Sequence, residues 1–182
     1  MRLLALDIAT STGWAYGPAD GKPLSGSVRL KRPQEPREVA PGNLGAFLRD
    51  RFDDWHAMGM LPDLIFVEDF LNPVAQPSAD AAIVQLMCHG AMHSEAAQWG
   101  IKVEKAMPAT IRRHFVGQAR VAKGGPKDAI KRLVRDRCAL LGYVDKLCVD
   151  FDRTDALAAW DYAAHLFGRR RPADFELFRG AR

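Results

Sequence analysis

The chain has 182 residues, of which 48% are hydrophobic and 26% are charged. This length predicts one globular domain, because domains usually hold about 100–200 residues, and the apolar fraction excludes a wholly disordered chain. No apolar run approaches the roughly 20 residues of a membrane span, and Asp7 interrupts the apolar N-terminus, so we expect neither a membrane anchor nor a signal peptide. Three cysteines without any CxxC pair indicate thiols in a reducing compartment.

The formal charge of +4 is distributed unevenly along the chain. Residues 1–99 hold 8 Lys+Arg and 12 Asp+Glu, a balance of −4, whereas residues 100–182 hold 18 and 10, a balance of +8. Within 102–137, 11 basic residues accompany 3 acidic ones. A basic block beside an acidic half is typical of a protein that holds a polyanion near a metal site, although a solubilising surface has the same charge pattern.

The first third of the chain is predicted to form a β-meander followed by one helix. Short apolar runs separated by turn residues predict strands over 2–8, 13–17 and 26–31. Asp20-Gly21 is a hairpin signal between the second and third strands. After a proline-rich loop, Asn43 is placed to cap a helix. The apolar positions of this helix recur at helical spacing and are Leu44, Phe47, Leu48, Phe52 and Trp55.

The rest of the chain is predicted to alternate strands and helices. We expect strands over 64–67 and 101–106, helices over 78–100, 108–115, 127–141 and 152–167, and a basic tail over 168–182 that follows a domain over 1–167. Three antiparallel strands followed by βαβ crossovers predict an α/β fold, with a five-stranded mixed sheet flanked by helices. Sheets of this kind bind ligands at the carboxyl ends of their parallel strands.

Four carboxylates are placed to converge at that edge of the sheet. Asp7 and Glu68 each end an apolar strand, and Asp152 and Asp155 lie three apart in the first turn of the last helix. Helix capping or salt bridges would also explain carboxylates at such positions. Four oxygen ligands together suit Mg²⁺ or Mn²⁺, and two such ions can catalyse in-line displacement at a phosphodiester.

These segments resemble the RuvC-type Holliday-junction resolvases of the RNase H-like superfamily, in their bacterial and phage versions, over about residues 2–167. The matching motifs are LLALDIATSTGWAYG around Asp7, LIFVEDF around Glu68, and DRTDALAAW around Asp152 and Asp155. The resemblance implies an RNase H-like fold and a metal site at these four acids, which bind two Mg²⁺ or Mn²⁺ ions. It also implies a homodimer that makes paired nicks in four-way DNA junctions in the cytoplasm, at the nucleoid or, for a phage protein, in the host cytoplasm.

The basic stretch matches the family segments that carry catalytic-site lysines. Lys127 falls on one lysine position, which implies a catalytic role, and Arg112 occupies the other. Either cation can neutralise phosphate charge, but Arg cannot donate a proton near neutral pH. A solvated helix face is the alternative for both. The residues expected to contact DNA are Phe70, Arg112, Arg113, Arg120, Lys123 and Lys131.

The sequence departs from the family pattern at two places. Ile8-Ala9 replaces the usual Pro-Gly after the first acid, and the aromatic residue expected after the second acid corresponds to Phe70 or to Leu71. A nuclease for RNA or other branched DNA, and a non-catalytic junction-binding module, remain alternatives.

Two further patterns concern helices and histidines. Small residues on the predicted 78–100 helix would suit close packing, against either a second subunit or the sheet. His89 and His93 are four residues apart on that helix, but without a third ligand nearby we expect them at the surface or an interface rather than at a zinc site.

Overall fold

A computed structural model of the chain describes residues 1–70, 78–119 and 128–168. One five-stranded sheet forms the centre of the molecule, with strand order β3-β2-β1-β4-β5. Its strands are β1 (Arg2–Asp7), β2 (Ser11–Pro18), β3 (Leu24–Arg29), β4 (Leu64–Glu68) and β5 (Lys102–Ala106). β2 pairs antiparallel with both β1 and β3, whereas β1, β4 and β5 are parallel to one another. The predicted mixed sheet is confirmed.

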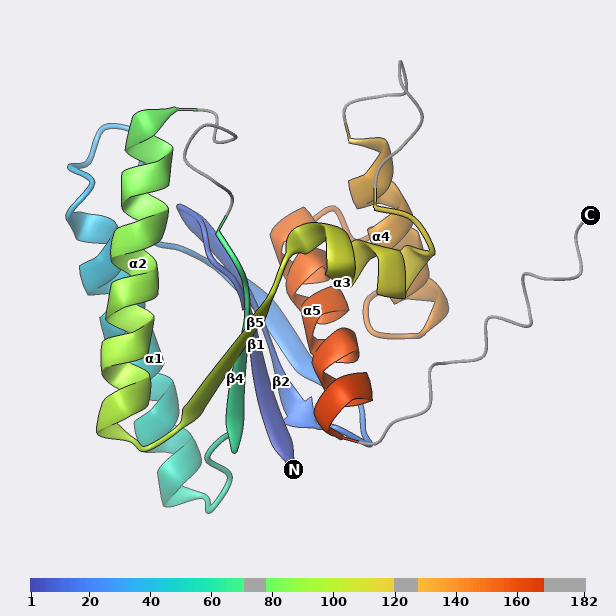
Figure 1. The fold of residues 1–182 in the computed structure, drawn as a ribbon, viewed down its shortest axis with the longest axis horizontal. Helices are drawn as coiled ribbons and strands as arrows, with labels where there is room; N and C mark the ends of the chain where they lie inside the picture. The colour runs from blue at the N-terminus through green and yellow to red at the C-terminus, as the bar shows by residue number, and fades with distance from the viewer. Residues whose placement is uncertain (71–77, 120–127, 169–182) are drawn as a thin grey trace, which may run out of the picture.

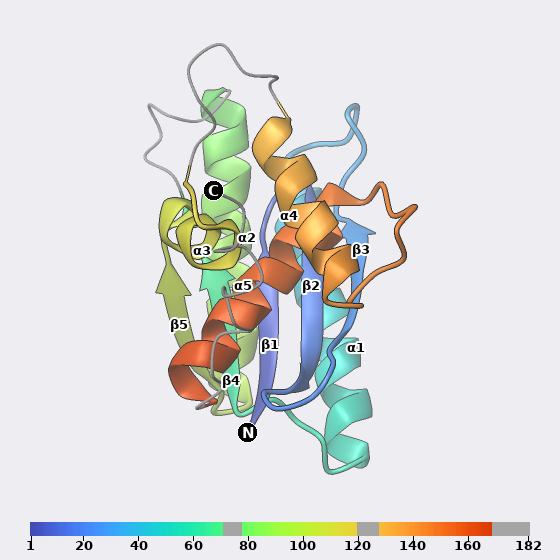
Figure 2. The same ribbon diagram turned by 90° about the vertical axis from the view of Figure 1, so that its right-hand side faces the viewer.

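Helices cover both faces of this sheet (Figures 1 and 2). They are α1 (Val39–Ala57), α2 (Ala79–Gln98), α3 (Pro108–Val116), α4 (Ala129–Leu140) and α5 (Phe151–Phe167). α1 and α2 lie on one face, and α5 lies on the other with α3 and α4 beside it. No helix in the described parts of the chain is long and apolar enough to cross a membrane.

Strand alternation divides the core into two layers. On the α5 face, the strand residues of β1 and β4 are Leu3, Ala5, Leu64 and Phe66. On the α1–α2 face, they are Leu4, Leu6, Ile65 and Val67. Continuing the same alternation by one residue places Asp7 and Glu68 together on the α5 face. The sheet therefore determines which helix can meet the two acids.

Several element boundaries differ from those expected from the sequence. α1 begins at Val39 rather than at Asn43, and the Asn43 side chain instead donates a hydrogen bond of 2.7 Å to the Leu30 carbonyl. Asp150, not Asp152, is the N-cap of α5. Lys127 and all but the first residue of the predicted 168–182 tail lie outside the described residues, so the domain boundary stays a prediction.

Candidate active site

Asp7 and Glu68 lie side by side at the carboxyl edge of the sheet. β1 and β4 are parallel, with Leu6 opposite Val67, so the next residue of each strand brings the two acids into register. Both side chains are on the face that α5 covers. This arrangement was predicted from two apolar strands that each end in an acid.

The first turn of α5 is held against β3 by side-chain hydrogen bonds. Asp150 accepts from the Arg153 backbone N–H at 3.0 Å and from the Ser27 hydroxyl at 2.7 Å. The Arg153 guanidinium donates to the Ser25 hydroxyl at 2.8 Å. These contacts fix the position of the turn that carries Asp152 and Asp155. Sequence reasoning missed Asp150, although an Asp three residues before Arg153 is a capping signal.

The acids of this edge form one electrostatic group, which we call the carboxylate cluster (Asp7, Glu68, Asp152 and Asp155). Burial, then the charges of Glu68 and Asp155, raise the pKa of Asp7 well above its ordinary value. Burial raises the pKa of Glu68 to about 7, and Asp155 adds to this effect. Burial also raises the pKa of Asp155, with a further contribution from Asp152. Such shifts are typical of functional sites.

Two cations lie against the carboxylate cluster. The Lys131 ammonium is 3.6 Å from Asp155 Oδ2, and an Arg112 guanidinium nitrogen is 4.0 Å from Glu68 Oε1. Both cations lower the pKa of Glu68 and Asp155 and so oppose the effect of burial. Lys131, expected only as a DNA contact, is therefore also an ion-pair partner of a candidate metal ligand.

The donor chemistry of the carboxylate cluster fits a hard divalent cation. All four donors are carboxylates; Asp155 is buried, Asp7 and Glu68 are half-buried, and a divalent ion would relieve the repulsion between their charges. Within residues 1–70, 78–119 and 128–168, no three His, Cys, Asp or Glu side chains are already arranged to hold a metal. The residues therefore fit such an ion by chemical type and proximity, and their side chains would have to rearrange to coordinate it.

The other predicted site residues are either exposed at the surface or outside the described residues. Phe70 is 37% exposed and meets His89 edge-on, with ring centroids 5.6 Å apart. Arg113 is exposed on α3. Arg120, Lys123 and Lys127 lie outside the described residues, so the structure does not place them.

The expectation for His89 was wrong. Its side chain is 5% exposed, and burial lowers its pKa to about 4. The imidazole therefore stays neutral near pH 7 and packs under Phe70. A lone histidine on an otherwise apolar helix face was the sequence signal for this burial.

The fold is shared with solved structures of junction resolvases. RuvC from Thermus thermophilus aligns with 91% of this chain and 95% of its own, at 20% identity and a TM-score of 0.67. T. thermophilus RuvC in complex with a Holliday junction substrate aligns at 22% identity, with a TM-score of 0.64 over 91% and 94% of the two chains. The yeast mitochondrial Holliday junction resolvase Ydc2 aligns at 12% identity, with a TM-score of 0.53 over 92% and 81%.

No protein-family model and no curated protein matches this sequence. The structural matches define the class of fold, which is RNase H-like. Within that class, the chain has the fold of the RuvC-type resolvases, as its three acidic motifs predicted.

Proposed function

We propose that this protein is a structure-selective endonuclease that resolves four-way DNA junctions during recombination and repair. The observation that carries the proposal is the convergence of the half-buried Asp7 and Glu68 with the buried Asp155 at the carboxyl edge of a RuvC-type sheet, where the charge of Asp155 raises the pKa of both strand acids. A scaffold without a catalytic site would have little reason to gather three mutually repelling acids, largely shielded from water, at one place.

The carboxylate cluster would hold two Mg²⁺ or Mn²⁺ ions, which supply an activated water and stabilise charge on the phosphate. Arg112 lies beside Glu68 and would neutralise charge on the bound phosphodiester. A guanidinium does not release a proton near neutral pH, so we assign the proton-donor role to another residue. That role falls in our proposal to Lys127, with Arg113, Arg120, Lys123 and Phe70 contacting the DNA around the site.

Paired nicks in a two-fold symmetric junction require two active sites, so we propose a homodimer. Support comes from α2, where Ile83 is 39% exposed and Leu86 is 57% exposed. Gly90, also exposed, follows at helical spacing and forms one continuous face with them. Ala96 of the same helix is buried in the core instead. In our proposal, some small residues of α2 therefore pack inside the domain and others face the second subunit. An enzyme of cellular or phage junctions would work in the cytoplasm, where its DNA substrate is.

The test is a cleavage assay with Mg²⁺ or Mn²⁺ on labelled four-way junctions, flaps, plain duplexes and structured RNAs. We expect symmetric paired nicks in the four-way junction and little cutting of the duplex. Preferential cutting of a flap or an RNA would replace the proposed substrate. Tight junction binding without cutting in either metal would identify a non-catalytic module.

Asp7→Asn is the internal control for this assay, because it removes a ligand charge without changing side-chain size. We expect it to abolish cleavage and to preserve junction binding. Undiminished cleavage by Asp7→Asn at saturating Mg²⁺ would contradict the assignment of the carboxylate cluster.

A further inference from the structure

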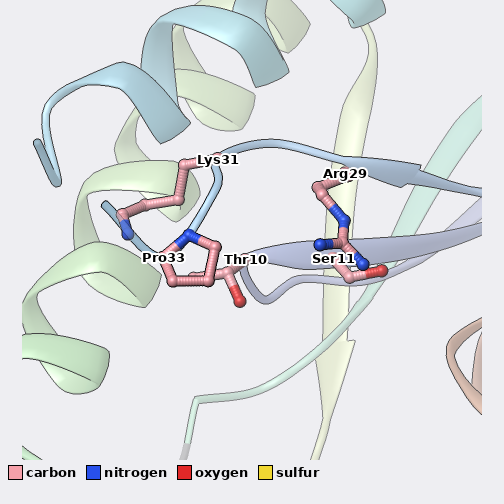
Figure 3. Close-up of a pocket in the computed structure, with 5 residues that line it drawn as sticks. All are labelled: Thr10, Ser11, Arg29, Lys31 and Pro33. Atoms are coloured by element: carbon pink, nitrogen blue, oxygen red, sulfur yellow. The ribbon is translucent and has the colours of Figure 1, made fainter. Parts of the chain in front are cut away.

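A second polar feature lies at the same edge of the sheet as the carboxylate cluster. It is a pocket between the β1–β2 turn and the segment that leaves β3 (Figure 3). We call it the β3-edge pocket, and its lining residues are Thr10, Ser11, Arg29, Lys31 and Pro33. Two cations and two hydroxyls thus face one small space that contains no acidic side chain.

The sheet places Ser11 and Arg29 of the β3-edge pocket on the same face as the acids. Gly13 is the register partner of both Asp7 and Ser27, and Ser11 is the partner of Arg29. Ser27 bonds Asp150 of α5, so Arg29, two residues further along β3, is also on the α5 face. β3 runs parallel to β1, because each is antiparallel to β2. Arg29 and Asp7 therefore lie at the same edge.

The distance between the two features suits one nucleic-acid strand. β3 is two strands away from β1, and Arg29 lies two residues beyond Ser27, which is level with Asp7. With about 4.8 Å between strands and about 3.3 Å per residue, the backbones of Asp7 and Arg29 are about 12 Å apart. An arginine side chain covers part of that distance. A strand whose scissile phosphate lay at the carboxylate cluster would have a neighbouring phosphate, within a few nucleotides, at the β3-edge pocket.

The charges of the pocket are available to an incoming anion. Among the residues that the structure describes, no carboxylate forms an ion pair with Arg29 or Lys31, in contrast to Arg112 and Lys131. The Lys31 ammonium donates to the Arg32 carbonyl at 3.0 Å, which leaves further donors. A guanidinium fork, an ammonium and hydroxyl donors are the groups that proteins use to bind phosphate oxygens.

We infer that the β3-edge pocket is a phosphodiester-binding subsite that holds the cleaved DNA strand on the β3 side of the carboxylate cluster. This inference rests on the proposed nuclease function and adds to it the path of the strand across the sheet edge. The subsite makes no base contact, so it contributes affinity and register but not sequence preference.

The test compares the double variant Arg29→Ala/Lys31→Ala with Lys22→Ala/Lys102→Ala. Lys22 precedes β3 and Lys102 begins β5, so both lie at the amino ends of these strands, away from the site. The control variant therefore removes the same number of positive charges at the other end of the sheet. We expect the Arg29/Lys31 variant to bind the four-way junction about tenfold more weakly, since charged hydrogen bonds are lost. The slope of log affinity against log salt should fall by about 0.9 for each phosphate lost, or about 1.8 for a homodimer on one junction. The control should change neither quantity.

A chemical probe locates the subsite on the strand. Junctions are made with one neutral methylphosphonate linkage at successive positions beside the cleavage site, and binding is measured for each. We expect one position, within a few nucleotides of the cut, to weaken binding to the wild type but not to Arg29→Ala/Lys31→Ala. Such a cycle isolates the contact between this pocket and that phosphate.

The outcomes separate the subsite from the proposed function. If the wild type cuts junctions and the Arg29/Lys31 variant matches the control in affinity and salt dependence, the subsite is wrong and the function stands. If the wild type prefers another nucleic acid, the proposed substrate is wrong, and the same comparison on that substrate tests the subsite alone. If the wild type binds no nucleic acid, both are wrong.

Discussion

The backbone carbonyl of Asp152 occupies the space that a side chain on Gly13 would need. A Cβ built on Gly13 would lie 1.8 Å from Asp152 O and 3.1 Å from the Ala156 methyl group. The absence of a side chain at this position of β2 lets the first turn of α5 approach the sheet closely. That approach brings Asp155 to the strand ends that carry Asp7 and Glu68.

Gly13→Ala should therefore displace the start of α5 and separate the carboxylate cluster. Because the obstructing atom is backbone, we expect a loss of about 1–3 kcal/mol in the free energy of unfolding, together with a severe loss of cleavage. Urea denaturation and the junction assay measure the two effects. Gly42→Ala is the matched control, since nothing lies within 4 Å of a Cβ there and helical Ala should be neutral or slightly stabilising. Equal behaviour of the two variants would contradict this role for Gly13.

The sequence was sufficient to predict the number and order of the strands and the convergence of Asp7 and Glu68 at one edge of the sheet. The reason is that each apolar run ends in an acid, and the carboxyl ends of parallel strands lie at the same edge of a sheet. α1 was mispredicted because Pro41 and Gly42 indicate a loop, yet both fit the first turn of a helix, where the backbone N–H has no intrahelical partner.

The contacts that complete the site could not be predicted, because they join segments distant in sequence. Nothing in the local sequence indicates that Lys131 pairs with Asp155, or that position 13 must lack a side chain so that α5 can pack against it. His89 is a different case, because the apolar helix face around it already indicated burial and only its contact with Phe70 depends on the fold. The element pattern is local information, whereas the ion pairs depend on how α4 and α5 dock.

A second polar network, away from the carboxylate cluster, should stabilise α5 without contributing to cleavage. Asp161 accepts a hydrogen bond of 2.8 Å from the Tyr143 hydroxyl and lies 3.3 Å from His114 Nε2. Tyr143→Phe should cost about 1–3 kcal/mol, because it removes a donor from a buried carboxylate. Chemical denaturation measures this, and the cleavage rate should stay unchanged. Tyr162→Phe, whose ring packs edge-on against Phe66, is the comparison and should cost less.

The stability of the metal-free protein should fall as pH rises from about 5 to 8. Glu68 takes up its proton at about pH 7 in the folded protein but near its ordinary value of 4.5 when unfolded. Between these values the folded state binds more protons, so raising the pH favours unfolding. Asp7 and Asp155 shift in the same direction. We expect a loss on the order of 1–3 kcal/mol in EDTA, measured by urea denaturation at each pH.

Glu68→Gln should flatten this pH dependence, and added Mg²⁺ should reverse it, because a divalent ion binds the ionised acids of the folded state. Asp53→Asn, an exposed carboxyl on α1, is the control and should retain the slope. If the stability of the metal-free wild type rose over this pH range, the acids of the carboxylate cluster would not have raised pKa values in the folded protein, and the prediction would be wrong.

The last prediction concerns Lys131, whose ammonium is 3.6 Å from Asp155 Oδ2. This charge compensates part of the repulsion in the metal-free cluster, and it lowers the pKa of Asp7, Glu68 and Asp155. A divalent cation placed among the same carboxylates would be repelled by the ammonium. Lys131→Gln should therefore raise the affinity for Mn²⁺ roughly two- to tenfold, an effect that is reduced at high salt.

Calorimetric titration of the DNA-free protein with Mn²⁺ measures this affinity directly. Lys131→Arg keeps the charge and should leave the affinity near that of the wild type, whereas Lys102→Gln removes a cation that pairs with Glu104 at the other end of β5 and is the distant control. Lys131→Gln should also destabilise the metal-free protein at pH 8, since the acids then lose their compensating charge. Weaker Mn²⁺ binding by Lys131→Gln would instead mean that the lysine holds Asp155 in position for the metal, and the competition argued here would be wrong.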